Sequence, residues 1–137
     1  MESNKKHIVI FSHAFGVKRD DRGLLDGPLG IAPALCAVGI ETVLFDYNDI
    51  DQVSNTLTVY PLSVKAEKLR DIVETVKRDN PETVIDILAH SQGCLVVALA
   101  NVDGIRKSIF LAPSLVQNID RMVETFRDRP GTEINFG

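Results

Sequence analysis

Residues 86–96, DILAHSQGCLV, decide how this chain folds. Strand-type residues run up to Ser91, and helix-type residues follow at once. Two positions to either side of this serine stand small residues, Ala89 and Gly93. A serine between a strand and a helix can act simply as an N-cap that accepts hydrogen bonds from free backbone N–H groups. The small neighbours instead favour a tight, strained turn that exposes the serine hydroxyl.

Strand-type and helix-type segments alternate along the chain. Short apolar runs rich in β-branched residues predict strands at residues 8–11, 42–45, 84–88 and 108–111. Apolar spacing predicts amphipathic helices over 63–80 and 115–129, a buried helix over 92–101 and a less regular helix over 29–38. We therefore expect a single α/β domain over residues 1–137, with a parallel sheet of about four strands and helices on both faces.

Several local expectations accompany this pattern. Ser63 is the expected N-cap of the helix over 63–80. Residues 47–60, YNDIDQVSNTLTVY, lack clear periodicity and are expected to form a long irregular connection that either carries substrate contacts or runs over the surface. Asp86 falls inside a predicted strand, where a buried carboxylate needs a partner that the sequence does not name. His7, before the first strand, is expected at the surface.

The composition argues against several classes of partner. The formal net charge is −4, and the Lys and Arg residues are interspersed with acids, so we expect no nucleic-acid partner. No apolar run is long enough to cross a bilayer or to serve as a signal peptide, which predicts a cytoplasmic protein. Cys36 and Cys94 lack metal-ligand spacing, so we expect buried free thiols, no metal site and no cofactor.

A second motif, SHAFG at residues 12–16, directly follows the first predicted strand. With AHSQG at residues 89–93, it makes the chain resemble the α/β-hydrolase family of serine esterases and lipases. The serine motif is similar to the GxSxG nucleophile elbow of that family, with Ala89 in place of the first glycine. The resemblance covers the amino-terminal portion of the fold, so we expect an incomplete α/β-hydrolase sheet without its carboxyl-terminal strands.

The resemblance implies a site at the carboxyl ends of the first and third strands. Ser91 would be the nucleophile that attacks a small-molecule acyl substrate, an ester or a related compound, and forms an acyl-enzyme. The backbone amides of Gln92 and Phe15 would form the oxyanion hole, with Ala14 as the alternative to Phe15. The residues expected to support the loop and the turn are His13, Gly16, Ala89, His90 and Gly93.

The acid and the base of a catalytic triad are not recognisable in this sequence. The family order is serine, then acid, then histidine, and no histidine follows His90. The final residues, TEINFG, read as an interrupted segment, so we expect a truncated part of a longer hydrolase that is inactive or very slow by itself. The alternative is a binding module that keeps the crevice and associates with a second copy through an open sheet edge.

Overall fold

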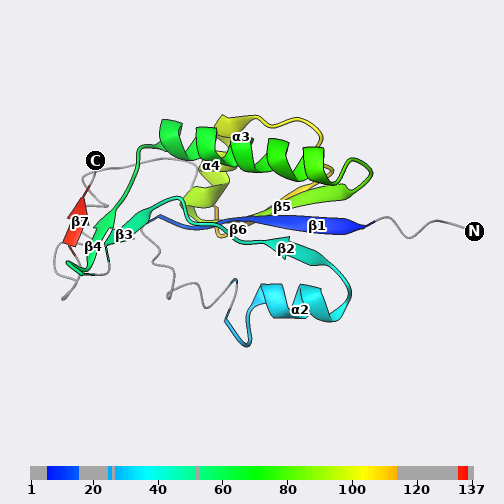
Figure 1. Ribbon diagram of the computed structural model, residues 1–137, viewed down its shortest axis with the longest axis horizontal. Helices are drawn as coiled ribbons and strands as arrows, with labels where there is room; N and C mark the ends of the chain where they lie inside the picture. Colours follow the sequence, from blue (N-terminus) through cyan, green and yellow to red (C-terminus); the bar gives the residue numbers. More distant parts are fainter. Residues whose placement is uncertain (1–5, 16–24, 26, 52, 114–132, 136–137) are drawn as a thin grey trace, which may run out of the picture.

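The parallel sheet predicted by the alternating pattern is present. The computed structural model describes residues 6–15, 25, 27–51, 53–113 and 133–135, which form a four-stranded parallel sheet and a separate three-stranded sheet (Figure 1). The parallel sheet has the strand order β2-β1-β5-β6. Its strands are β1 (His7–Ser12), β2 (Glu41–Val43), β5 (Val84–His90) and β6 (Ser108–Leu111). The predicted α/β fold class is therefore confirmed.

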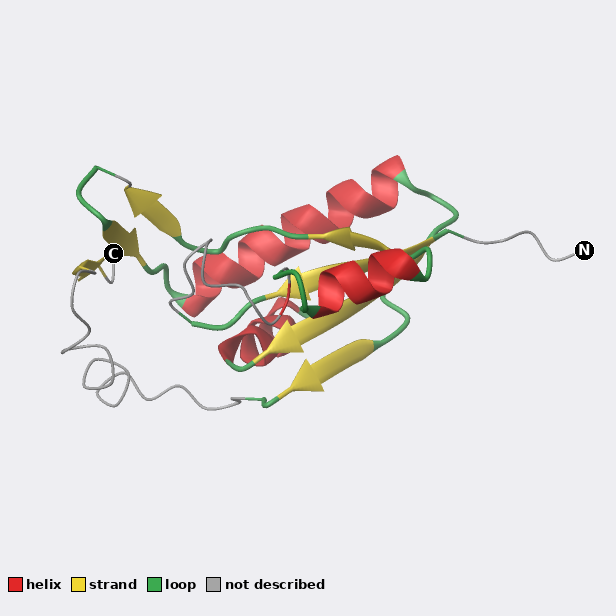
Figure 2. Cartoon of the chain, turned by 90° about the horizontal axis from the view of Figure 1, so that it is seen from below, coloured by secondary structure: helices red, strands yellow, loops and turns green. Residues whose placement is uncertain are grey.

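Helices cover both faces of this sheet. α2 (Ile31–Ala37) lies on one face, whereas α3 (Leu62–Asp79) and α4 (Gln92–Ala100) lie together on the other (Figure 1). Figure 2 shows the sheet from the side of α2. The helix predicted over residues 115–129 lies outside the described residues. Among the described helices, none combines the length and the apolar content needed to cross a bilayer.

The side-chain alternation of β1 explains why the sheet is covered twice. Ile8 and Ile10 point into the core cluster that α3 and α4 complete. Val9 and Phe11 point the opposite way, into the cluster that includes Ala32 of α2. Successive side chains of a strand face opposite sides, so a strand that is apolar at every position needs cover on both sides.

Two local expectations about the helices are wrong. α3 begins after Pro61, and no side chain caps it, so Ser63 is not the N-cap. The earlier start lets Leu62 pack on the core as the first helical residue. Cys36 is exposed, unlike the buried thiol of Cys94. Ala32 is buried, and Ile31 and Leu35 pack beside it against the sheet, whereas Cys36 is exposed near the carboxyl end of this short helix.

The segment over residues 47–60 is not irregular, which corrects the sequence-based expectation. β3 (Asp49–Asp51) pairs antiparallel with β4 (Thr56–Thr58) to form a hairpin. β7 (Glu133–Asn135) then pairs parallel with β4 and completes the second sheet. This sheet lies beyond the carboxyl ends of the parallel strands (Figures 1 and 2). Strands of three residues are too short to produce a recognisable alternating pattern.

Turn chemistry closes this hairpin. Oδ1 of Asp51 accepts hydrogen bonds from the backbone N–H groups of Val53 and Ser54, at 2.9 and 3.2 Å. Asn55 has a φ of 54°, a left-handed conformation that asparagine tolerates better than most residues. The sequence therefore did carry a turn signal here, although the flanking strands were too short to be recognised.

A charged cluster at the amino end of the sheet supplies the missing partners of Asp86, which is only 3% exposed. Arg106 donates to both carboxylate oxygens, at 3.0 and 2.5 Å, and the N–H of Lys107 donates to Oδ1. Nε2 of His7 lies 2.6 Å from Oδ2, so His7 is partly buried in this cluster and not simply a surface residue. The hydrogen bonds from Arg106, followed by that of His7, lower the pKa of Asp86 despite its burial.

We predict that Asp86→Asn lowers the free energy of unfolding by about 2 to 3 kcal/mol at pH 7, because it removes the charge on which this buried cluster is built. A carboxyl whose pKa is lowered by folding stabilises the fold above its ordinary pKa of 3.8, and loses that effect as the pH falls further. Urea denaturation should show a smaller difference in the free energy of unfolding between the wild type and Asp86→Asn at pH 3 than at pH 7. Glu41→Gln, which breaks the exposed ion pair with Lys6, is the control and should cost less than about 0.5 kcal/mol.

Candidate functional site

The turn between β5 and α4 holds Ser91 in a backbone conformation that L-residues rarely adopt, with φ 52° and ψ −121°. Its N–H donates to the carbonyl of Leu111 at 3.0 Å, and its carbonyl accepts from the N–H of Cys94 at 3.0 Å. The Ser91 side chain makes no capping hydrogen bond to α4. The simple N-cap explanation therefore does not account for this serine. Strain of this kind persists only where the surrounding structure imposes it, and it is typical of functional sites.

The first turn of α4 touches the end of β1. A Cβ atom added to Gly93 would lie 2.2 Å from the carbonyl oxygen of Ser12 and 2.6 Å from that of His13. Oγ of Ser12 donates to the carbonyl of Gly93 at 2.9 Å, and the strand register pairs Ser12 with the fully buried Ala89. The motifs at residues 12–16 and 89–93 therefore meet at the carboxyl ends of two neighbouring strands. Only glycine leaves room for this approach.

Tyr47 contacts two residues of the first motif, Ser12 and His13, and the sequence analysis did not single it out. Its side chain is buried, and its hydroxyl lies 2.6 Å from Oγ of Ser12. Because the Ser12 hydroxyl donates its proton to Gly93, Tyr47 must donate to Ser12. Burial raises the pKa of Tyr47, which keeps that donor protonated. The ring also packs against those of His13 and Phe45, which follow β1 and β2.

Both ring nitrogens of His13 are hydrogen-bonded. Nε2 accepts the backbone N–H of Tyr47 at 2.8 Å, so the ring proton sits on Nδ1, which donates to the carbonyl of Ala14 at 2.7 Å. These are the contacts that a loop-bracing residue would make. They leave neither nitrogen available to take a proton from Ser91.

Lys65 of α3 reaches the same place from a third element. Lys65 is only 1% exposed, although charged residues of the amphipathic helix predicted here would be expected on its solvent-facing side. Nζ donates to Oε1 of Gln92 at 2.8 Å and lies 5.1 Å from the centroid of the Phe15 ring. Burial lowers the pKa of Lys65 to about 8. One ammonium group therefore contacts the side chains of both residues whose amides are the expected oxyanion donors.

The remaining expected residues can be placed as follows. Ala14 and Phe15 follow β1 and are partly buried, and His90 is the last residue of β5 and also partly buried. Gln92 is buried at the start of α4. Gly16 lies outside the described residues. Over the described ranges, no group of three or more His, Cys, Asp or Glu side chains could hold a metal ion.

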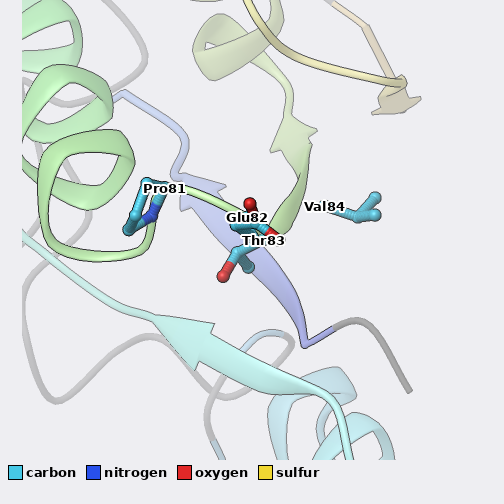
Figure 3. Close-up of a pocket in the computed structure, with 4 residues that line it drawn as sticks. All are labelled: Pro81, Glu82, Thr83 and Val84. Atoms are coloured by element: carbon cyan, nitrogen blue, oxygen red, sulfur yellow. The ribbon is translucent and has the colours of Figure 1, made fainter. Parts of the chain in front are cut away.

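An open hollow elsewhere on the molecule is unrelated to this site. Its lining residues are Pro81, Glu82, Thr83 and Val84, at the amino end of β5 (Figure 3). Ser91 follows the opposite end of the same strand. Because substrates of parallel α/β sheets bind at the carboxyl ends of the strands, the hollow contributes nothing to the interpretation of Ser91.

No protein-family model and no curated protein matches the chain.

We predict that Gly93→Ala lowers the free energy of unfolding by about 3 kcal/mol or more, because the new methyl group would collide with two backbone carbonyls. Gly39→Ala is the matched control, since Gly39 has a φ of +83° but nothing lies within 4 Å of its added Cβ. The control should cost only about 1 kcal/mol of left-handed strain. Chemical denaturation of both variants measures the difference, and equal costs would refute the close contact.

Lys65 should make the stability of the fold depend on pH. A lysine whose pKa is lowered by folding binds its proton less tightly in the native state, so its burial becomes less costly as the pH rises from 8 toward 10.5. Relative to that of Lys65→Met, the free energy of unfolding of the wild-type chain should rise by about 2 kcal/mol between pH 7 and pH 9.5. Urea denaturation across this range measures it. Lys77→Met on the same helix sets the baseline, and a difference that does not change with pH would contradict the burial of the amine.

Proposed function

We propose that this chain carries the nucleophile and oxyanion portion of a serine hydrolase of the α/β-hydrolase type, which cleaves an ester or a related small acyl compound. The observation that carries the proposal is the backbone of Ser91, strained at a strand-to-helix turn with its side chain unused as a cap. Glycine would adopt this conformation without strain, and a role for the hydroxyl group would explain why a serine stands here instead. The contact of Gly93 with the end of β1 supports it, because that contact brings the SHAFG loop to the serine.

The proposed reaction proceeds by acyl transfer. Oγ of Ser91 attacks the carbonyl carbon, and the π electrons of the carbonyl move to its oxygen, which becomes an oxyanion. The N–H of Gln92, at the positive end of α4, and the N–H of Phe15 or Ala14 would donate to that oxygen. The tetrahedral intermediate then collapses and breaks the bond to the alcohol oxygen, which takes up the proton that Ser91 lost to the base. Water hydrolyses the acyl-serine, which releases the carboxylic acid and restores the Ser91 hydroxyl group. This route needs no metal ion and no organic cofactor.

A general base must take the proton of Ser91, and an acid must orient that base. Among the described residues, none forms a hydrogen bond to Oγ of Ser91, and His13 is fully engaged elsewhere. We therefore assign the nucleophile and the oxyanion amides and leave the base unassigned. Free thiols at Cys36 and Cys94 suit a reducing compartment, so we place the reaction in the cytoplasm.

A fluorescent active-serine phosphonate applied to the full-length gene product tests the proposal. The wild-type protein should be labelled, Ser91→Ala should not, and Ser63→Ala on the outer side of α3 should be labelled like the wild type. Ser91→Gly should also lose labelling, but its free energy of unfolding should rise by about 1 kcal/mol because glycine adopts a positive φ without strain. An unlabelled wild-type protein, or a labelled Ser91→Ala variant, would overturn the assignment.

The exposure of β6 favours one alternative function. β6 is an edge strand of the parallel sheet, and its residues Ile109 and Phe110 are 44% and 38% exposed. Uncovered edge strands can pair with another chain. The alternative is therefore a non-catalytic module that associates with a second copy through β6. A folded protein that resists the phosphonate and sediments as a dimer, with dimerisation lost in Phe110→Lys, would favour this alternative.

A further inference from the structure

We propose that Lys65 is a positioning residue of the oxyanion site. Its ammonium group holds the loop after β1 against the first turn of α4 through its contacts with Phe15 and Gln92. The same group adds positive charge beside the developing oxyanion. The inference rests on the proposed hydrolase function and extends it to a residue of α3. It follows from the side chains that Lys65 contacts and from its burial.

The contacts of Lys65 connect three separate elements. The hydrogen bond to Oε1 of Gln92 fixes the side chain of the first residue of α4. The ring of Phe15, from the loop after β1, lies within cation–π distance of the same Nζ. Displacement of either residue would break a contact with the ammonium group. A shift of Phe15 relative to Gln92 is therefore opposed by interactions that both residues share.

The burial of Lys65 is costly and has no local compensation by an acid. Burial is the cause of its lowered pKa, and within the described part of the chain no carboxylate forms an ion pair with it. A buried charge without a counter-ion acts over a longer distance than a paired one, because little water is present to screen it. The positive potential of Lys65 is thus available to an anion that forms near the amides of Phe15 and Gln92.

Two other roles fit the geometry less well. Direct binding of a substrate carboxylate would require an accessible Nζ, and this side chain is almost completely covered. A role as the base for Ser91 would require a hydrogen bond to Oγ, whereas Nζ donates to Gln92. Lys65 therefore acts through its neighbours, which is the definition of a positioning residue.

Other titratable groups stand on the elements of this site and must be separated from Lys65 in any pH experiment. They are Lys68 of α3, Asp46 and Tyr47 after β2, His13 after β1, His90 of β5 and Cys94 of α4. Burial raises the pKa values of Tyr47 and Cys94, and the two nitrogens of His13 are both hydrogen-bonded. Lys65→Arg leaves all these groups in place and substitutes a cation that does not titrate below pH 12. It therefore isolates the titration of Lys65.

The first test is the rate of phosphonate labelling of Ser91 in the full-length gene product from pH 6.5 to pH 9.5. The wild-type labelling rate should fall as the pH rises, with an apparent pKa near 8, because deprotonation of Lys65 removes its charge and its cation–π contact with Phe15. Lys65→Arg should lack this decrease. Lys65→Met should react about ten- to a hundredfold more slowly at pH 7, again without the decrease. Lys77→Met, at the other end of α3, should match the wild type.

The second test does not depend on activity. In ¹⁵N–¹H correlation spectra, the backbone amides of Phe15 and Gln92 should shift together with one apparent pKa near 8 in the wild-type chain, and neither should do so in Lys65→Arg. Absence of Ser91 labelling in the wild type would refute the proposed function. Labelling with the same pH profile in wild type and Lys65→Arg, or amides of Phe15 and Gln92 that titrate independently of Lys65, would refute the role of Lys65 alone.

Discussion

The contact between Gly93 and the carbonyl oxygens of Ser12 and His13 is the constraint on which the rest of the site depends. It brings the backbone of α4 against the end of β1 at a distance that no side chain would permit. With α4 fixed there, the chain leaving β5 has one residue in which to turn, and Ser91 adopts a positive φ. The strain at Ser91 is thus a consequence of helix–strand packing and not of the serine itself.

The sequence predicted the parts of the fold that rest on long or strongly apolar patterns. β1, β5 and α4 have nearly continuous apolar runs, and their order and parallel pairing follow from alternation and chain topology. The hairpin of β3 and β4 was missed because each strand is only three residues long. Its third strand, β7, comes from a distant part of the sequence, which no local pattern can reveal.

The candidate site was predictable only along its backbone. AHSQG and SHAFG indicated a tight turn and a loop, and both lie at neighbouring strand ends. The side chains that hold this site in place were not predictable, because Tyr47 stands in a segment without periodicity and Lys65 has the residue type of a solvated helix face. A lysine is marked as unusual only by its burial, which depends on tertiary packing. The partners of Asp86 were hidden for the same reason, since Arg106 and His7 are far from it in sequence.

The pairing of β4 with β7 has a kinetic consequence. Thr56 is paired with Glu133, so these residues are separated by more than half the length of the chain. Closing so long a loop costs conformational entropy, so β7 should pair with β4 slowly. β3 and β4 are close neighbours in sequence and should pair faster. During synthesis on the ribosome, the hairpin is made long before its third strand emerges. Until then β4 lacks its partner β7, and the second sheet stays incomplete.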